Sequence, residues 1–455
     1  MKNLSIIGAG PCGCLLSIYL ARRGYNINLY ERRPDMRSAQ FAEGRSINLA
    51  ISARGLLALE QAGMKELIIA NAVAIKGRAV HIKDGSPEKY YLYGRNQQEI
   101  NYSISRKLLN SLLLGEAEQY NNITIHFEHK ITGVDIKAST ISALNNNSLQ
   151  LEVIKFDQLI ATDGAGSAVR DSLNQLQIID FDNKLLNVGY KEILLPSTNA
   201  SSLKPEYLHI WPRKEFMLMG LANLDHSFTL TLFAPLKGET GLKNLTEEHA
   251  VSQFFLQNFP ELSKMIPNLT KVFLQNPTAN LFTVQGKPWY FEDKILLIGD
   301  AAHTIVPFFG QGINCGFEDC RLFNQMLDDK ENVGKQLFRN FYQKRKANTD
   351  AIAEMAFQNY DEMRKGVSDV DYSFYYYIER ELMSRFPDQY VSRYILVSYT
   401  HCPYSFAHEA GKLQKALLNE IYSQSISNKE INWQIVANLV DHYSKQIAIV
   451  TRHTF

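Results

Sequence analysis

The chain has 455 residues, 45% of them hydrophobic and 21% charged, which is ordinary composition for a globular protein with a large core. Lys and Arg number 48 and Asp and Glu number 47, so the net charge of +1 excludes the basic balance on which nucleic-acid binding depends. The five cysteines form no C-x-x-C pair and have no zinc-ligand spacing, which indicates reduced thiols in a cytoplasmic protein without a metal site.

The first thirty residues carry the pattern of a dinucleotide-binding unit. In chain order we expect a strand, a G-x-G-x-x-G turn, a helix and a second strand, at Leu4–Ile7, Gly8–Gly13, Leu15–Arg22 and Ile27–Tyr30. Gly8 permits the tight turn, Gly10 lets the backbone approach a pyrophosphate, and Gly13 lets the helix pack on the strand. The helix N-terminus offers N–H groups to phosphate, and Glu31 can accept hydrogen bonds from a ribose. A plain glycine turn in a parallel sheet is the alternative interpretation.

The same N-terminal run superficially resembles a signal peptide, because it follows Lys2 and is mostly apolar. Three glycines and Pro11 interrupt it, and no small-residue cleavage site follows. We therefore expect mature structure here. No uninterrupted apolar stretch is long enough to predict a membrane-spanning helix.

Two later segments combine a buried strand with a polar turn. The first strand, over Asp157–Ala161, is followed by Thr162, Asp163 and a glycine. The second, over Lys294–Ile298, leads into Gly299-Asp300-Ala301-Ala302-His303 and then Gly310-Gln311-Gly312-Ile313-Asn314. A helix is expected next, over Cys315–Leu327, with two acids, Glu318 and Asp319, placed to suit its dipole.

The remaining chain predicts a second layer of structure. Two insertions, 76–96 and 181–277, read as strands of an antiparallel sheet, and the clearest strands are Glu206–Pro212, Phe216–Leu221 and Ser227–Ala234. Ser105 is a candidate N-cap for a helix over Lys107–Glu118. Residues 371–455 are predicted to be a helical, aromatic-rich cap, and a discontinuous dinucleotide domain should comprise 1–75, 97–180 and 278–370.

These three motifs, in this order, resemble those of the single-component flavoprotein monooxygenases, the class of p-hydroxybenzoate hydroxylase. The resemblance implies an α/β fold: a Rossmann-like FAD domain with an inserted antiparallel substrate sheet. It also implies that Asp300 holds a ribityl hydroxyl, and that the Gly310–Asn314 loop passes the flavin pyrimidine edge, where amide dipoles stabilise the reduced anion. The residues expected to bind FAD are Gly8, Gly10, Gly13, Glu31, Arg32, Arg45, Ala50, Arg106, Thr162, Asp163, Asp300, Gly312, Ile313 and Asn314.

Other segments are similar to those of one branch of that family, the kynurenine 3-monooxygenases. They are Gly44–Ala50, Leu208–Arg213, Ser227–Phe233 and Val306–Gly312. The resemblance implies that a clamp for an amino-acid substrate is formed by Arg78, Tyr93, Asn359 and Tyr404, with apolar walls from Phe233, Phe308 and Phe309. A guanidinium can hold the kynurenine carboxylate through two hydrogen bonds. A surface ion pair for Arg78, amphipathic tyrosines and plain core phenylalanines are the alternatives.

The resemblance further implies the reaction. NADPH reduces FAD, dioxygen forms a flavin hydroperoxide, and one oxygen passes to the ring of L-kynurenine, which yields 3-hydroxy-L-kynurenine. Such chemistry needs positioning and a dry cavity, so no catalytic residue is expected beyond positioning by Gly310, Gln311, Gly312 and Asn314. His303 and His209 are expected to be structural. The preference for NADPH over NADH comes from the resemblance alone.

Several alternatives stay open from the sequence. A same-fold flavin hydroxylase could act on another aromatic amino or phenolic acid. A flavin-dependent reductase or halogenase is a second class, although the W-x-W-x-I-P stretch of halogenases is missing. A flavin-binding scaffold without turnover is the third. Mitochondrial relatives continue into a hydrophobic anchor, whereas the tail after Glu420 is mixed and polar, so we expect a cytoplasmic monomer or weak homodimer.

Overall fold

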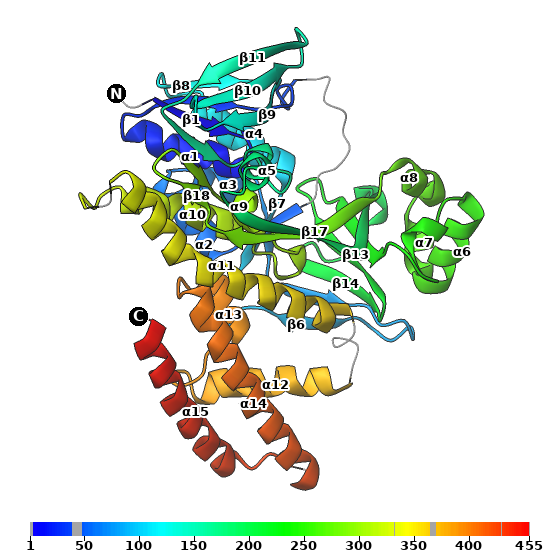
Figure 1. Ribbon diagram of the computed structural model, residues 1–455. Helices are drawn as coiled ribbons and strands as arrows, with labels where there is room; N and C mark the ends of the chain where they lie inside the picture. The colour runs from blue at the N-terminus through cyan, green and yellow to red at the C-terminus, as the bar shows by residue number, and fades with distance from the viewer. Residues whose placement is uncertain (1–2, 39–47, 332, 365–369, 429, 455) are drawn as a thin grey trace. The chain divides into compact units, whose positions relative to one another are not determined.

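The computed structural model describes residues 3–38, 48–331, 333–364, 370–428 and 430–454. The chain divides into two compact units, each assembled from three separate stretches (Figure 1). The first unit comprises residues 1–73, 102–188 and 279–349. The second comprises 74–101, 189–278 and 350–455.

The first unit contains both strands and helices. They are β1 (Asn3–Ile7), α1 (Pro11–Arg22), β2 (Asn26–Tyr30), β3 (Asn48–Ile51), α2 (Ala53–Gln61), α3 (Lys65–Ala70), α4 (Arg106–Ala117), β8 (Ile123–His126), β9 (His129–Asp135), β10 (Thr140–Asn145), β11 (Gln150–Lys155), β12 (Gln158–Ala161), α5 (Ala168–Gln175), β17 (Ala279–Lys287), β18 (Tyr290–Phe291), β19 (Ile295–Leu297), α9 (Asp300–His303), the 3-10 turn Pro307–Phe309 and α10 (Gly312–Met326). Four elements cross the division: β4 (Val73–Ile75), β7 (Asn101–Ser105), β13 (Asp180–Leu195) and α11 (Lys335–Arg364).

The main sheet of the first unit has the strand order β18-β19-β12-β1-β2-β8. Its strands run parallel, apart from the short β18 at one edge. The strand β1 is buried from Leu4 to Ile7, as expected for a parallel strand covered on both faces. The chain leaves β1 for β2 on one side and later adds β12 and β19 on the other. The carboxyl end of β1 is therefore a topological switch point, where open α/β sheets bind their ligands.

The second unit combines antiparallel strands with two groups of helices. Its elements are β5 (Gly77–Val80), β6 (Lys89–Leu92), β14 (Tyr207–Arg213), β15 (Phe216–Ala222), β16 (Phe228–Pro235), α6 (Glu248–Asn258), α7 (Pro260–Met265), α8 (Leu269–Gln275), α12 (Val370–Arg385), α13 (Arg393–Tyr399), α14 (Tyr404–Asn428), α15 (Trp433–Thr454) and the 3-10 turns Ser197–Asn199 and Leu242–Asn244. The strands β14, β15 and β16 form an antiparallel meander, and β5 adds parallel to β14 with Arg78 opposite Leu208. The order continues to β6 at the edge.

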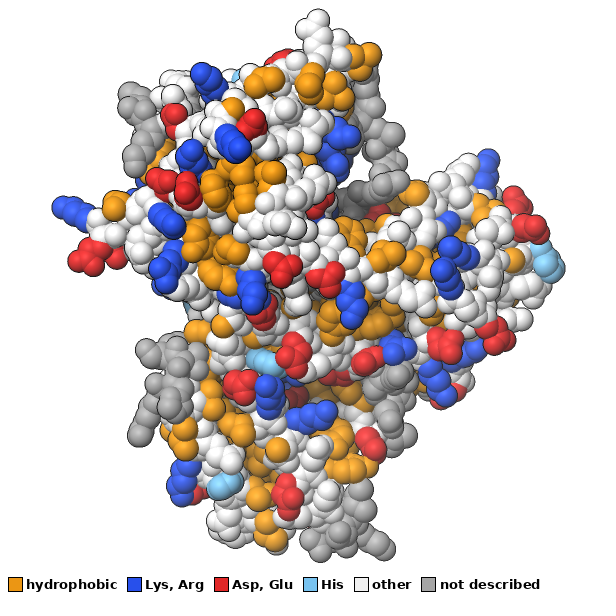
Figure 2. All heavy atoms as spheres, in the orientation of Figure 1, with side chains coloured by type: hydrophobic (Ala, Val, Ile, Leu, Met, Phe, Trp, Pro, Cys, Tyr) orange, Lys and Arg blue, Asp and Glu red, His pale blue; other side chains and the backbone are white. Residues whose placement is uncertain are grey.

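The C-terminal helices have a hydrophobic cluster of their own. Buried residues from α12, α13, α14 and α15 make it, with Tyr390 and Val440 completely buried, and α14 and α15 lie side by side (Figure 1). Among the described residues, no helix is both long and apolar enough to cross a membrane. On the face drawn in Figure 2, basic and acidic side chains are interspersed, in keeping with the net charge of +1.

The predicted strands and helices that surround the glycine motifs are confirmed, but two expectations differ from the structure. Residues 248–275, which the sequence places within a strand-rich insertion, form the three helices α6, α7 and α8. Pro260 begins α7 at the position where its missing N–H costs nothing, so it separates helices instead of ending strands. In addition, the predicted division near residue 370 falls instead after Thr349, within α11, and the helices after it group with the antiparallel sheet.

Candidate functional site

The glycine turn after β1 leaves open space at one glycine and none at the other two. A Cβ atom on Gly13 would lie 2.0 Å from the Gly8 carbonyl oxygen, and one on Gly8 would lie 2.7 Å from the Cα of Asp163. Gly8 also has φ +98°, a conformation that side chains resist. Around Gly10, by contrast, no atom of the described residues other than its chain neighbours lies within 4 Å of the point that a Cβ atom would occupy. The turn is thus packed tightly against β12 while its middle, beside the N-terminus of α1, is free to approach a pyrophosphate.

Glu31 closes β2 with its carboxylate next to this turn. The side chain is buried and accepts hydrogen bonds from the Ala9 amide at 3.1 Å and from Arg33 Nε at 2.8 Å. Its position after β2 is the one from which an acid reaches a ribose. Arg32 is exposed, and Arg45 lies outside the described residues.

The turn after β12 contacts the glycine motif directly. The Thr162 hydroxyl donates to the carbonyl oxygens of Ile7 and Gly8 at 3.0 and 2.9 Å. Asp163 follows, and its buried Oδ1 has no hydrogen-bond partner in the described structure. Burial raises the pKa of the Asp163 carboxyl. A buried acceptor without a partner is costly, so this atom fits a ligand hydroxyl or a water.

The segment Gly299–Asn314 has two glycines in the left-handed region and one asparagine that hydrogen-bonds it to neighbouring backbone. Gly299 has φ +63° and Gly310 has φ +65°, and between them Asp300 begins α9 with a partly exposed side chain. Asn314, completely buried, accepts a hydrogen bond from the Ser52 amide at 2.8 Å and donates to the Ala50 and Gly310 carbonyls at 2.8 Å. The first turn of α10, which carries Gly312 and Ile313, is therefore tied to β3 and to the start of α2.

The first unit fits a dinucleotide on these observations. It combines the open position at Gly10 with buried polar atoms that have no partner in the described structure: Asp163 Oδ1, Ser52 Oγ and Ser103 Oγ. Arg106 begins α4 with an exposed side chain, and Ser105 caps that helix by accepting from the Leu108 amide at 3.1 Å. Exposed cations such as Arg106 remain available to phosphate.

The second unit contains all four predicted clamp residues, and two side chains, Glu362 and Tyr93, lie near Arg78. The Arg78 side chain is 13% exposed and lies 3.5 Å from Glu362 on α11, while its buried Nε has no hydrogen-bond partner in the described structure. Asn359 lies one turn before Glu362 on the same helix, so the two side chains share a face. Burial raises the pKa of the Tyr93 hydroxyl to about 12, and the positive charge of nearby Arg78 acts in the opposite direction.

Tyr394 completes this cluster, and sequence reasoning missed it. Its ring stacks on Tyr93 with centroids 4.6 Å apart, and its hydroxyl accepts a hydrogen bond from Asn101 Nδ2 at 3.0 Å. The predicted Tyr404 begins α14, ten positions later, and is completely buried. A signal for Tyr394 was available in the aromatic run of α13, but the sequence does not show whether α13 or α14 presents its tyrosine to Tyr93.

The predicted apolar walls are divided between the units. Phe233 is buried on β16 beside Tyr190, with ring centroids 5.8 Å apart. Phe308 and Phe309 are buried in the turn that precedes Gly310. Their role as walls stays a prediction.

Known proteins resemble the chain over nearly its whole length. Residues 2–355 match a family model described as FAD binding domain. Kynurenine 3-monooxygenase of Legionella pneumophila (strain Corby) is 42% identical over 98% of the chain and 99% of the relative. The enzyme of the same name from Myxococcus xanthus is 38% identical over 96% of the chain and 94% of the relative.

Solved structures establish the fold independently. 2-Methyl-3-hydroxypyridine-5-carboxylic acid oxygenase superposes with a TM-score of 0.66 at 17% identity, over 80% of the chain and 93% of that protein. p-Nitrophenol 4-monooxygenase from Pseudomonas putida superposes with a TM-score of 0.65 at 14% identity, over 85% and 95%. At such low identity these neighbours bear on the architecture alone.

Proposed function

The chain belongs to the kynurenine 3-monooxygenase family, within the FAD-binding proteins, and we propose that it converts L-kynurenine, NADPH, a proton and dioxygen into 3-hydroxy-L-kynurenine, NADP⁺ and water. It is thus a flavoprotein monooxygenase. The observation that supports the substrate most strongly is the Arg78 cluster, because a guanidinium with a buried, unpartnered Nε fits the carboxylate of an amino acid.

The clamp supports an amino acid over a simple aromatic acid. Beside the cation at Arg78 lies the carboxylate of Glu362, so the cluster offers a partner to each charge of a zwitterion. The stacked Tyr93 and Tyr394 add phenol groups and flat apolar surface next to it. We propose that Arg78, Tyr93, Asn359 and Tyr394 hold the amino-acid end of the substrate, with Tyr404 kept as the alternative second phenol.

FAD, when bound, supplies the redox chemistry that activates dioxygen. The residues proposed to hold it are Gly8, Gly10, Gly13, Glu31, Thr162, Asp163 and Asp300, with Ala50, Gly312, Ile313 and Asn314 along the loop and Arg32, Arg45 and Arg106 as outer cations. The protein orients the aromatic ring and excludes water from the reacting atoms. The aniline nitrogen already enriches the ring in electrons, so no covalent nucleophile is required of the chain.

NADPH is proposed as the reductant because the family uses it, and a second nucleotide-binding motif is not evident in the sequence. The expectations of a cytoplasmic protein and of a monomer or weak homodimer stay predictions.

The test is aerobic oxidation of pyridine nucleotide by the purified FAD-loaded protein. We expect L-kynurenine to accelerate oxidation of NADPH more than oxidation of NADH, and p-hydroxybenzoate to have no effect. Stimulation by the phenolic acid but not by L-kynurenine would favour the runner-up, a same-fold hydroxylase of another aromatic acid. A yellow protein that no aromatic compound stimulates would contradict both.

A further inference from the structure

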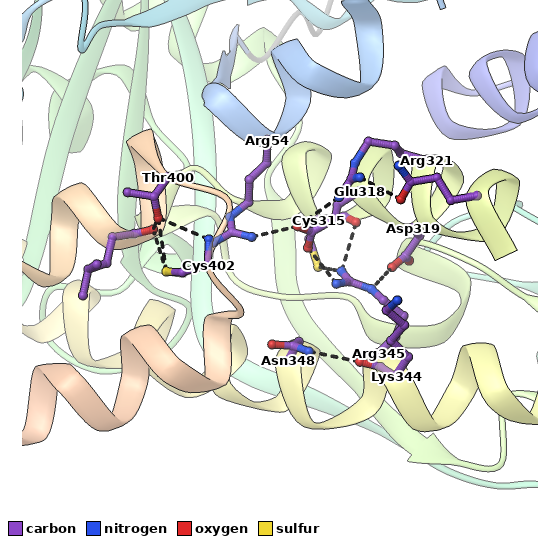
Figure 3. Close-up of polar contacts among 12 residues, drawn as sticks. Arg54, Cys315, Glu318, Asp319, Arg321, Lys344, Arg345, Asn348, Thr400 and Cys402 are labelled. Carbon is purple, nitrogen blue, oxygen red and sulfur yellow. Dashed lines mark hydrogen bonds and ion pairs between the residues drawn. The ribbon is translucent and has the colours of Figure 1, made fainter. Parts of the chain in front are cut away.

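Five charged side chains form a buried ion network in the first unit: Arg54, His303, Glu318, Asp319 and Arg345. Their side chains are at most 6% exposed. Figure 3 shows Arg345 of α11 directed at both acids of α10, with Arg54 reaching Glu318 from α2. Nothing in the sequence motifs predicts these pairings.

Asp319 connects the network to the turn that carries Asp300. Its Oδ2 accepts a hydrogen bond from the Gly299 amide at 3.0 Å and lies 2.5 Å from His303 Nε2. These two partners stand immediately before and three residues after Asp300. Its Oδ1 accepts from Arg345 Nε at 2.6 Å. One carboxylate therefore fixes both ends of α9 and is itself fixed by a single arginine.

Glu318 connects the network, through Arg54, to the start of α2, which contacts Asn314. It accepts from Arg345 Nη1 at 2.6 Å and from Arg54 Nη1 at 2.7 Å. Arg54 lies in the first turn of α2, two residues after Ser52, whose amide donates to Asn314. Arg345 thus reaches the Gly299–Asp300 turn through Asp319 alone, and the start of α2 beside Asn314 through Glu318 and Arg54.

Arg345 contacts two of three residues whose side chains could together hold a metal ion. His303, Cys315 and Asp319 place possible ligand atoms within 4.8 Å of one another. Arg345 already donates to Asp319 and lies 3.2 Å from the Cys315 sulfur, so a metal cation would have to displace a guanidinium. Burial alone would lower the pKa of His303, but Asp319 raises it well above its usual value.

Three arginines face the two carboxylates of the network, because Arg321 lies 4.0 Å from Glu318 in addition to Arg54 and Arg345. Buried ion pairs of this kind contribute little to stability compared with apolar residues of the same size, because removing charges from water is costly. The excess positive charge and the aimed hydrogen bonds therefore suggest a role beyond stability.

We propose that Arg345 is a positioning residue for the flavin, which holds Asp319 and thereby the Gly299–Asp300 turn in the conformation that receives the ribityl chain. The positive excess of the network also favours the reduced, anionic flavin over the oxidised one. The proposal rests on the FAD site of the proposed function and is independent of the aromatic substrate.

The experiment compares Arg345→Lys and Asp319→Asn with the exposed control Arg339→Met on the same helix. FAD affinity of the apoprotein, the visible spectrum and the reduction potential are measured without kynurenine or NADPH. Both network variants should weaken FAD binding by about tenfold or more, as loss of a residue behind a ligand commonly does. Arg345→Lys keeps the charge of the network, whereas Asp319→Asn removes one negative charge. The potential of Asp319→Asn should therefore lie above that of Arg345→Lys, by about 30 mV for each tenfold gain in affinity for reduced over oxidised flavin.

A purely structural role predicts a different pattern. The network variants would then melt at lower temperature, yet their folded holoprotein would match wild type in FAD affinity, spectrum and potential, which would overturn the proposal. Arg345→Met removes one charged partner from each of two buried acids and is the variant most prone to misfold, so the two conservative variants decide the outcome. Wild-type binding of FAD with no turnover of kynurenine would count against the proposed substrate and not against this inference.

Discussion

The ring of Tyr394 lies stacked on that of Tyr93, with centroids 4.6 Å apart and planes inclined by 22°. The first tyrosine comes from α13 and the second follows β6, so residues 301 positions apart meet beside Arg78. The structure therefore favours Tyr394 over Tyr404 as the second phenol of the clamp, because Tyr394 is the residue that stacks on Tyr93.

Replacement of each tyrosine by phenylalanine should therefore give different results. Tyr394→Phe removes the hydroxyl that accepts from Asn101, and we expect KM for L-kynurenine to rise about fivefold, as for the loss of one hydrogen bond of about 1 kcal/mol. Tyr404→Phe, at a completely buried ring outside the stacked pair, should raise KM less than Tyr394→Phe does. Steady-state kinetics of both variants give the comparison, and the reverse ranking would assign the clamp to Tyr404.

Arg78→Met should weaken substrate binding without weakening FAD binding. Loss of a charge-assisted hydrogen bond costs about 1.5–3 kcal/mol, so KM for L-kynurenine should rise roughly 10- to 150-fold. Arg385→Met, which removes a surface arginine of the same unit, is the matched control. An unchanged KM in the Arg78 variant would remove the main support for an amino-acid clamp.

Two alanine variants separate folding from cofactor binding in the glycine turn. Gly10→Ala introduces a Cβ into open space, so the apoprotein should keep its melting temperature while FAD affinity falls. Gly13→Ala places a Cβ 2.0 Å from the Gly8 carbonyl, so the apoprotein itself should be destabilised. Thermal unfolding without FAD and titration with FAD distinguish the two. Equal melting temperatures for both variants would show that the close packing at Gly13 is misassigned.

Acid should destabilise the second unit through a buried histidine pair. His209 Nε2 donates to the Lys204 carbonyl at 2.9 Å, so its Nδ1 accepts from His81 Nε2 at 2.8 Å, and both rings are neutral. Burial, His209 and Arg213 lower the pKa of His81 to about 3, with Glu88 the nearest acid at 3.9 Å.

The unfolded chain binds a proton at His81 below an ordinary pKa of about 6.5 that the folded chain does not bind until about pH 3. Stability is therefore complete above about pH 6.5 and falls as the pH decreases, by roughly 2 kcal/mol at pH 5 on an order-of-magnitude basis. Urea unfolding of wild type and His81→Gln at pH 7.5 and pH 5 measures this loss in the free energy of unfolding, and the exposed His226→Gln is the control. The two proteins should differ in slope against pH, and parallel slopes would contradict the assignment.

The flavin fold could be predicted from the sequence because its signals are local. Gly8, Gly10 and Gly13 indicate the turn, and Glu31 follows at the expected interval. The predicted bounds of β1, α1 and β2 therefore agree with the structure to within a few residues. The two later turns were found in the same way, because each pairs a buried strand with polar residues at its carboxyl end.

The parts that could not be predicted depend on tertiary contacts. Glu318 and Asp319 read as acids suited to the start of a helix, whereas their real partners are Arg345 and Arg54, far away in the chain. Likewise, the choice of Tyr394 over Tyr404 depends on which of two helices, α13 or α14, packs beside Tyr93. The local sequence of either helix carries no information about that packing.

The most direct test of the proposed function is the origin and position of the new oxygen. The FAD-loaded protein is incubated with NADPH and L-kynurenine under ¹⁸O₂, and the product is purified and analysed by mass spectrometry. We expect 3-hydroxy-L-kynurenine that contains one ¹⁸O atom, formed in proportion to the NADPH consumed. Consumption of NADPH that yields unlabelled kynurenine and only hydrogen peroxide would contradict the assignment of L-kynurenine as the substrate.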